Sequence, residues 1–433
     1  MGTPCRVTVA VRACPCGEST RAAEPCRAIT VVHHMTRTEI RSALALALVV
    51  GLRMFGLFLV LPVLALDLQR MPGVTPLLIG VALGIYGVGH LLLQIPLGLL
   101  SDRIGRKPVI TLGLALFALG SLLAALAHGV DGIILGRALQ GTGAVTGASQ
   151  ALAADLSTEH SRNAVMGILG SMIGLAFLLA MLLGSTLAAH LGGLQGLFGL
   201  TFVLVLVAIV ALWLLVPHAP APRVHGSEGL AAIVHTLRDA RLLALDVSAF
   251  VLHGLLTLFF VAMPLQLAHG LHLRVGEQWR VYVPALLAAG LVMGGALPRL
   301  RGLDASVRVT QASALLLGLG LLALAFARGS LVLGLLGAIL FFVAFSLLEA
   351  SMPSLVSRLA QPARRGAALG AYSAAQFFGV IVGGGAGGVL LGASGVRGVF
   401  IAGASVALLW LLMLLAAGAR LGQSAPAAES GMG

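Results

Sequence analysis

The chain has 433 residues, of which 59% are hydrophobic and only 10% are charged. Soluble domains carry about a quarter charged residues, so this composition excludes an ordinary water-soluble protein. The net charge of +12 would suit a nucleic-acid-binding protein by number alone, but the charges lie between long apolar stretches, where they orient a membrane protein. We therefore expect the lipid bilayer as a partner, and no nucleic acid.

The first 34 residues differ from the rest of the chain. They contain arginines, prolines and all four cysteines, which are Cys5, Cys14, Cys16 and Cys26. They lack the run of about 7–15 apolar residues that a signal peptide needs. We expect residues 1–34 to be a disordered extension, or sequence upstream of the true start, because Met35 opens a more ordinary beginning. We expect no metal site and no cofactor.

Twelve apolar stretches follow, each long enough to cross about 30 Å of hydrocarbon as a helix of roughly 20 residues. Lipid offers no partners for backbone N–H and C=O groups, so only helices or a closed barrel can span it. The stretches lack the alternating pattern of barrel strands, which predicts an all-α membrane protein. We place the twelve transmembrane helices at 42–66, 76–100, 108–127, 132–154, 164–189, 197–217, 242–264, 279–298, 306–327, 330–357, 367–392 and 398–418.

The distribution of basic residues predicts the topology. Most lysines and arginines lie before the first stretch or after an even-numbered one. The positive-inside rule then places both termini of this multi-pass protein in the cytoplasm.

The stretches divide into two halves of nearly equal length, with landmarks such as Gly184 and Gly384 recurring at an offset near 200. We expect six-helix halves at 35–217 and 242–418, and a short tail at 419–433. The linker at 218–241 begins Pro-rich and continues with apolar and basic residues at helical spacing, which predicts an amphipathic helix on the inner membrane surface. Two parallel six-helix halves are a transporter architecture with its site between them.

The densest motif is the turn after the second stretch, Gly98-Leu-Leu-Ser-Asp-Arg-Ile-Gly-Arg-Lys-Pro108. Gly98 lets neighbouring helices approach closely, and Gly105 tolerates a positive φ at the turn. An acid in this cationic turn needs a partner, so Asp102 is expected to pair with Arg106 or a helix N-terminus. Arg103, Arg106 and Lys107 would anchor the turn at the inner surface.

This turn resembles the signature loop G-x-L-x-D-R-x-G-R-K of the major facilitator superfamily. Residues 137–143 are similar to a second superfamily pattern, R-x-x-Q-G-x-G, which includes Gln140. Further stretches resemble the YajR-type bacterial inner-membrane transporters, at 52–58, 94–98, 136–141, 349–357 and 370–377. The resemblance implies two pseudo-symmetric halves that transport by alternating access, in a multi-pass protein of the bacterial inner membrane.

The resemblance also implies a cytoplasmic latch. In that family the acid of the turn, here Asp102, pairs with Arg106, and the pair links to an acid that ends the fourth helix, here Asp155. The same acid caps the start of helix 11, here near Gly366–Gly370, and so holds the two halves together on the cytoplasmic side. The plain alternative is that these charges only fix the topology.

Charged side chains inside the stretches are the next candidates. An Arg at the centre of a membrane helix costs roughly 2.5–3.5 kcal/mol on insertion scales, so its presence indicates a partner or a function. Arg53 and Arg137 lie in the first and fourth stretches, and His253 and Glu349 in the seventh and tenth. The resemblance associates Arg137 with proton coupling, and His253 or Glu349 has the chemistry to carry a proton. Each has an alternative role in packing.

Glycines predict close helix contacts. Small residues four apart, as at Gly379 and Gly383, mark faces on which membrane helices pack or slide. We expect such roles for Gly184, Gly370 and Gly383. Gly184 is followed by Ser185, whereas drug/proton antiporters of the superfamily tend to have Gly-Pro in helix 5. This difference weakens the assignment of the chain as a drug/proton antiporter.

The chain lacks the motif of an ATP-binding loop and those of common hydrolases, so we expect no enzyme. We predict a monomeric secondary transporter, driven by protons, that exports a small drug-like or sugar-like molecule, with neutral or amphipathic cargo favoured over phosphates. The alternatives are a passive facilitator, a proton symporter, or a membrane sensor that binds a ligand without transporting it.

Overall fold

The computed structural model describes residues 35–158, 160–218, 239–296, 303–361 and 364–421. In this part of the chain every regular element is a helix. The first half contains α1 (Arg37–Leu59), α2 (Leu61–Gln69), α3 (Pro76–Gly84), α4 (Tyr86–Ile104), α5 (Arg106–Ala125), α6 (Val130–Thr142), α7 (Thr146–Asp155), α8 (Arg162–Leu191) and α9 (Leu194–Leu215).

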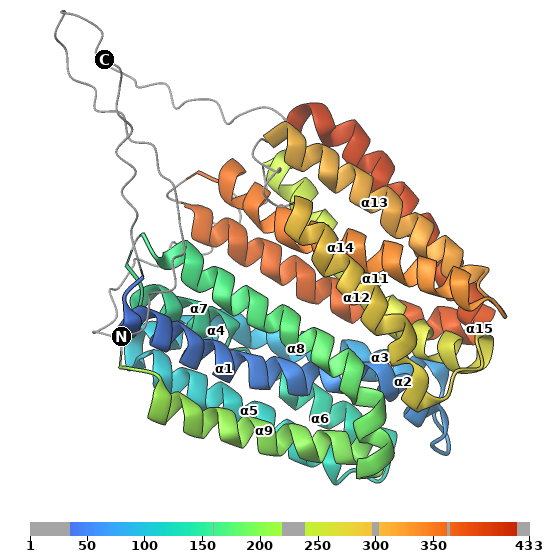
Figure 1. The fold of residues 1–433 in the computed structure, drawn as a ribbon, viewed down its shortest axis with the longest axis horizontal. Coiled ribbons are helices and arrows are strands. Elements are labelled where there is room, and N and C mark those ends of the chain that lie inside the picture. Colours follow the sequence, from blue (N-terminus) through green and yellow to red (C-terminus); the bar gives the residue numbers. More distant parts are fainter. Residues whose placement is uncertain (1–34, 159, 219–238, 297–302, 362–363, 422–433) are drawn as a thin grey trace, which may run out of the picture.

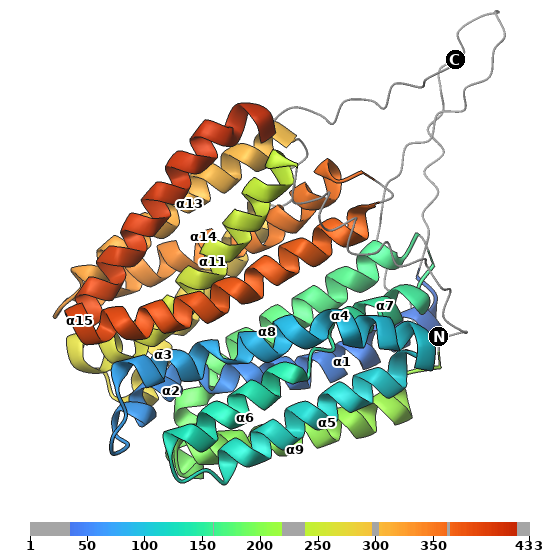
Figure 2. The ribbon, with the colours of Figure 1, turned by 180° about the vertical axis from the view of Figure 1, so that it is seen from behind.

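The second half contains α11 (Ala240–Leu265), the short helices η1 (Gln266–Gly270) and η2 (Val275–Glu277), α12 (Trp279–Ala296), α13 (Leu303–Ala325), α14 (Leu331–Leu359) and α15 (Arg365–Leu421). The two halves form two bundles that lie side by side (Figures 1 and 2). Residues 1–34 and most of the linker, with its predicted amphipathic helix, lie outside the described residues.

Several predicted helices are broken near their middle. Val60 separates α1 from α2, because Pro62 lies at the start of α2 and cannot donate a backbone hydrogen bond. Residues 143–145 separate α6 from α7, with Gly143 at φ −74° and ψ 42°. Gly395 in α15 lies in the gap predicted between the stretches 367–392 and 398–418, and its φ of 64° and ψ of −175° favour glycine. Periodicity within an apolar stretch carries no signal for the breaks at Val60 and at residues 143–145.

The breaks matter for the count of membrane spans. In the described part of the chain, nine helices are long and apolar enough to cross a membrane. One of them, Arg365–Gly418, contains the last two predicted stretches on either side of Gly395. The fourth predicted stretch is divided between α6 and α7, and the eighth, α12, has 18 residues and ends where the description stops. Twelve spans remain a prediction.

Apolar side chains cover both the inside and the outside of the bundles. Phe117 and Phe198 in the first half, and Phe259 and Phe341 in the second, are fully buried. Other large apolar side chains point outwards, with Leu214, Leu291 and Val332 among the most exposed. An exterior of this kind suits lipid rather than water.

The halves pack most closely where α3 meets α15. A methyl group added at Gly80 would overlap the carbonyl oxygen of Gly384, and one at Gly388 would lie 2.6 Å from the carbonyl oxygen of Pro76. Only glycine permits helix backbones to approach so closely. We call the end of the bundle with Pro76 the far end, and the end with the 98–108 turn the motif end.

The predicted packing glycines have mixed outcomes. A methyl group at Gly184 would lie 2.7 Å from the carbonyl oxygen of Leu59, and one at Gly383 would overlap the backbone of Gly254. In this conformation a methyl group at Gly98 or Gly370 would meet no described atom within 4 Å, so close packing there stays a prediction. Both lie towards the motif end, where the halves are less closely packed than at the far end.

Candidate functional site

The motif turn brings together three of the predicted latch residues. Gly105 ends α4 with a φ of 97°, which confirms the expected positive φ and lets α5 begin at Arg106. The Arg106 guanidinium donates to Asp102 and, at 3.2 Å, to Asp155 at the end of α7. It also donates to the Ser101 hydroxyl at 2.7 Å, so one cation ties α4, α5 and α7 together. Arg103 is exposed.

The predicted cap on the eleventh span is not formed in this conformation. Among the described residues Asp102 pairs with Arg106 alone, and its side chain is 34% exposed. Neither Gly366 nor Gly370, at the start of α15, has a described neighbour that an added methyl group would touch. The charge cluster is therefore assembled within the first half, while the contact between the halves that the latch requires is open.

Arg53 lies deep in the first half, on α1. Its Nη2 donates to the carbonyl oxygen of Gly143 at 3.0 Å and to the Tyr86 hydroxyl at 3.3 Å. The Arg53 side chain is fully buried, and its Nε has no hydrogen-bond partner. The break between α6 and α7 supplies the Gly143 carbonyl, because that group no longer serves a continuous helix.

Arg137 on α6 is the second buried cation. Its Nε donates to the carbonyl oxygen of Ala82 at 3.3 Å, and its Nη1 donates to the side-chain oxygen of Gln140 at 3.0 Å. Gln140 in turn donates to the Ser121 hydroxyl at 2.8 Å. Within the described residues neither Arg53 nor Arg137 forms an ion pair with a carboxylate, so the first half holds two buried positive charges on neutral acceptors.

The acids lie in the second half instead. His253 on α11 faces Glu349 on α14, with 3.5 Å between His253 Nε2 and Glu349 Oε2. Gln376 on α15 joins them, because its side-chain nitrogen lies 3.2 Å from His253 Nε2 and 3.5 Å from Glu349 Oε1. The Glu349 side chain is 42% exposed although it lies within a predicted span. The structure therefore brings together the two residues that were predicted as proton carriers.

The hydrogen bonds of His253 define where its ring carries a proton. Its Nδ1 lies 3.1 Å from the carbonyl oxygen of Ala249, which only accepts, so Nδ1 carries a proton. In the neutral ring Nε2 accepts from Gln376. In the protonated ring Nε2 becomes a donor and forms a charged pair with Glu349.

Sequence reasoning missed Asp246 and Tyr372. Asp246 on α11 is only 5% exposed, and one of its carboxylate oxygens has no hydrogen-bond partner. Tyr372 on α15 is also buried without a hydroxyl partner, within electrostatic range of Asp246 and Glu349. The available signal for Asp246 was an acid inside the predicted span 242–264.

Contacts between the halves continue from the far end to the middle of the bundle. The His90 ring of α4 stacks on Phe377 of α15 with 3.7 Å between ring centres, and Gln94 donates to the Ser373 hydroxyl at 2.9 Å. These contacts join α15, which also carries Gln376, to α4 of the first half. A movement of α15 relative to α4 would therefore also move Gln376.

A model of the Major Facilitator Superfamily matches residues 46–303, more than half of the chain. The chain belongs to this superfamily, and its fold is that of a membrane transporter rather than an enzyme. It is 40% identical over 384 residues to the inner membrane transport protein YajR of Escherichia coli, covering 88% of this chain and 84% of that protein. An uncharacterised transporter of Buchnera aphidicola is 29% identical over 358 residues, covering 81% and 90% of the two chains.

Solved structures agree on the fold. The POT family transporter PepTSo superimposes with a TM-score of 0.73 at 15% identity, covering 88% of this chain and 98% of that one. The nucleoside transporter NupG superimposes with a TM-score of 0.69 at 15% identity, covering 88% and 99%. The chain is therefore a multi-pass membrane transporter of the YajR type.

Proposed function

We propose that the chain is a proton-driven secondary transporter of the bacterial inner membrane that exports a small organic molecule by alternating access. The proposal includes twelve spans, cytoplasmic termini and a monomeric protein. The observation that carries it is the cluster of His253, Glu349 and Gln376, because a partly exposed acid beside a histidine can take up and release a proton.

The cluster offers a way to couple a proton to the movement of the halves. Gln376 lies on α15, the helix that packs against α4 of the other half through Phe377 and Ser373. Protonation of Glu349 removes its charge and weakens its attraction for His253 and Gln376. The side chains that hold α15 to α11 and α14 would then rearrange, which favours one arrangement of the halves over the other.

We interpret the arrangement in this structure as the one open at the motif end. Far-end contacts between Gly80 and Gly384 are closed, whereas Gly98 and Gly370 are free of described neighbours. With the motif end in the cytoplasm, this is the inward-open state. The outward-open state would separate the far end and close Asp102 on the start of α15.

The test is transport by the purified protein in proteoliposomes. Candidate compounds are screened for flux with and without an imposed pH gradient, together with an internal pH-sensitive dye. Proton-driven export predicts that a pH gradient drives the compound uphill and that protons move in the opposite direction. Flux without gradient dependence would indicate a facilitator, proton movement in the same direction would indicate a symporter, and binding without flux would indicate a sensor.

The latch gives a separate prediction. Asp102→Asn should reduce transport by about tenfold, the effect of a coupling free energy of 1–2 kcal/mol, because the outward-open state loses the charge that closes the motif end. Membrane insertion and the amount of protein should not change, since the arginines of the turn remain. Transport rates are compared with those of Asp131→Asn, which removes an acid from the first turn of α6. Equal transport by the two variants would contradict the latch.

A further inference from the structure

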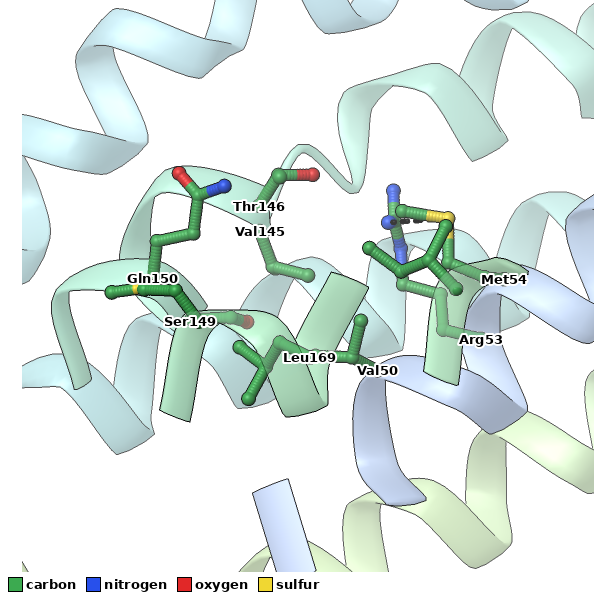
Figure 3. Close-up of a pocket in the computed structure, with 10 residues that line it drawn as sticks. Val50, Arg53, Met54, Val145, Thr146, Ser149, Gln150 and Leu169 are labelled. Carbon is green, nitrogen blue, oxygen red and sulfur yellow. Dashed lines mark hydrogen bonds between the residues drawn. The ribbon is translucent and has the colours of Figure 1, made fainter. Parts of the chain in front are cut away.

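A small cavity lies within the first half, between α1, α7 and α8. Its volume is about 90 Å³, and its polar lining comes from Arg53, Thr146, Ser149 and Gln150 (Figure 3). Val50 and Leu169 belong to its apolar wall. A cavity needs a volume of roughly 10–15 Å³ to hold one water molecule, so this one has room for a few waters or one small polar group.

Two residues that line the cavity each have a buried polar atom without a partner in the structure. Arg53 Nε and the Ser149 hydroxyl both lack a hydrogen bond, although Arg53 is 1% exposed and Ser149 is 3% exposed. Buried polar groups are normally satisfied, and a buried cation normally has a counter-charge. Here the acceptors of Arg53 are a carbonyl, a hydroxyl and, at 3.9 Å, the sulfur of Met54, all of them neutral.

The start of α7 adds further donors beside the same cavity. Because the chain breaks at 143–145, the helix begins at Thr146, and its N-cap residue Val145 provides no side-chain hydrogen bond. The first N–H groups of such a helix lack partners, and they carry the positive end of the helix dipole. Figure 3 shows Val145 and Thr146 at this helix start, facing the same space as Arg53.

All of these features favour a negative charge. A guanidinium with a free Nε, an unpaired hydroxyl and an uncapped helix start are the groups that recognise small oxyanions in proteins. One positive side chain balances one negative charge, and the apolar wall suits a hydrocarbon rather than a second charged group. A monocarboxylate attached to an apolar body fits this combination better than a phosphate dianion.

We propose that this cavity is the subsite for the carboxylate of the transported molecule, with Arg53 as its counter-charge and Ser149 and the start of α7 as further donors. The inference rests on the proposed function and narrows the cargo to an amphipathic organic anion. The sequence predicted neutral or amphipathic cargo, and this proposal keeps only the amphipathic class. The sequence could not show that Arg53 has neutral partners alone.

The experiment measures equilibrium binding to the purified full-length protein by isothermal titration calorimetry. The probes are hexanoate, hexanamide, hexyl phosphate and chloride, at one pH and without a gradient. The carboxylate subsite predicts that hexanoate binds and that hexanamide and chloride bind at least about tenfold more weakly. It also predicts that hexyl phosphate binds no more tightly than hexanoate. Stronger binding of hexyl phosphate, or equal binding of hexanamide or chloride, would overturn the proposal.

Variants connect this binding to the cavity. Ser149→Ala should weaken hexanoate binding by about fivefold or more, since it removes a donor to a charged group. Ser185→Ala is the matched control, because Ser185 is also a buried hydroxyl without a partner but does not line the cavity. Arg53→Gln should abolish binding, and if that variant does not fold, the comparison of the two serine variants decides. Equal hexanoate binding by the two serine variants would overturn the subsite.

The outcome is independent of proton coupling. Binding is measured without a gradient, so failure of the proton-driven mechanism would leave the hexanoate result unchanged. Conversely, a protein that transports with a pH gradient but does not bind hexanoate would retain the proposed function and lose the carboxylate subsite.

Discussion

Glu349→Gln should abolish transport driven by a pH gradient and leave exchange of the substrate across the membrane intact. Glutamine retains the size and hydrogen bonds of glutamate towards Gln376 but cannot take up or release a proton. Proton-transferring side chains contribute about a hundredfold or more to the steps they serve, and we expect a loss of that order. The measurement compares gradient-driven flux with counterflow, in which labelled substrate exchanges against unlabelled substrate at equal pH.

The control for this prediction is Glu277→Gln. Glu277 lies in η2 and does not belong to the cluster. Its carboxylate pairs with the Arg280 guanidinium at 3.4 Å. It should show normal gradient-driven flux, so a defect shared by both variants would indicate a general effect of removing an acid. Gradient-driven flux at the original rate in Glu349→Gln would contradict a role for Glu349 in coupling.

Gly80→Ala and Gly384→Ala should each disfavour closure of the far end and slow transport. Either added methyl group would overlap the backbone of the opposite helix, which forces α3 and α15 apart. Overpacking of a tight contact costs roughly 1–3 kcal/mol, and this reduces the population of the far-end-closed state by about 5–150-fold. Transport should fall accordingly, while the variant still inserts, because each half keeps its own packing.

The readout is the labelling of a single cysteine placed at the far end, together with the transport rate. We expect faster labelling and slower transport in both variants. Gly199→Ala is the control, since Gly199 lies on α9 and an added methyl group there meets no described atom within 4 Å. Unchanged labelling and transport in Gly80→Ala would show that the α3–α15 contact does not limit the cycle.

Much of the organisation was predictable because lipid restricts the choice of structure. Apolar runs, basic connections and the 98–107 turn predicted an all-helical protein of two halves, and the family match and the fold agree with that. The grouping of Asp102, Arg106 and Asp155 was also expected, through the resemblance. Such features are encoded locally, within one turn or one helix.

The rest depends on contacts between distant segments. The sequence identified His253 and Glu349 separately, but Gln376, which joins them, lies on a third helix and was marked only as part of the stretch 370–377. Gly98 and Gly370 were expected to pack, whereas the close contact is at Gly80 and Gly384. Which small residue meets another depends on how the halves are tilted, and this changes during a transport cycle.

The unpaired groups around Arg53 were equally invisible. Its acceptor Gly143 and the cavity beside it exist because α6 ends and α7 begins within a single apolar stretch. A continuous helix would have satisfied the Gly143 carbonyl within the helix, and it would have had no start at Thr146 with N–H groups in need of partners. Helix breaks inside membrane proteins occur where backbone lines a cavity, so they are informative once a structure shows them.

Distances between the two halves test alternating access most directly. In a chain with its native cysteines replaced, one spin-label pair joins Arg103 and Arg358 at the motif end, and a second joins Arg70 and Arg280 at the far end. Pulsed electron resonance is recorded across pH and with substrate. Alternating access predicts that the motif-end distance shortens as the far-end distance lengthens. Both distances changing in the same direction, or neither changing under any condition, would contradict it.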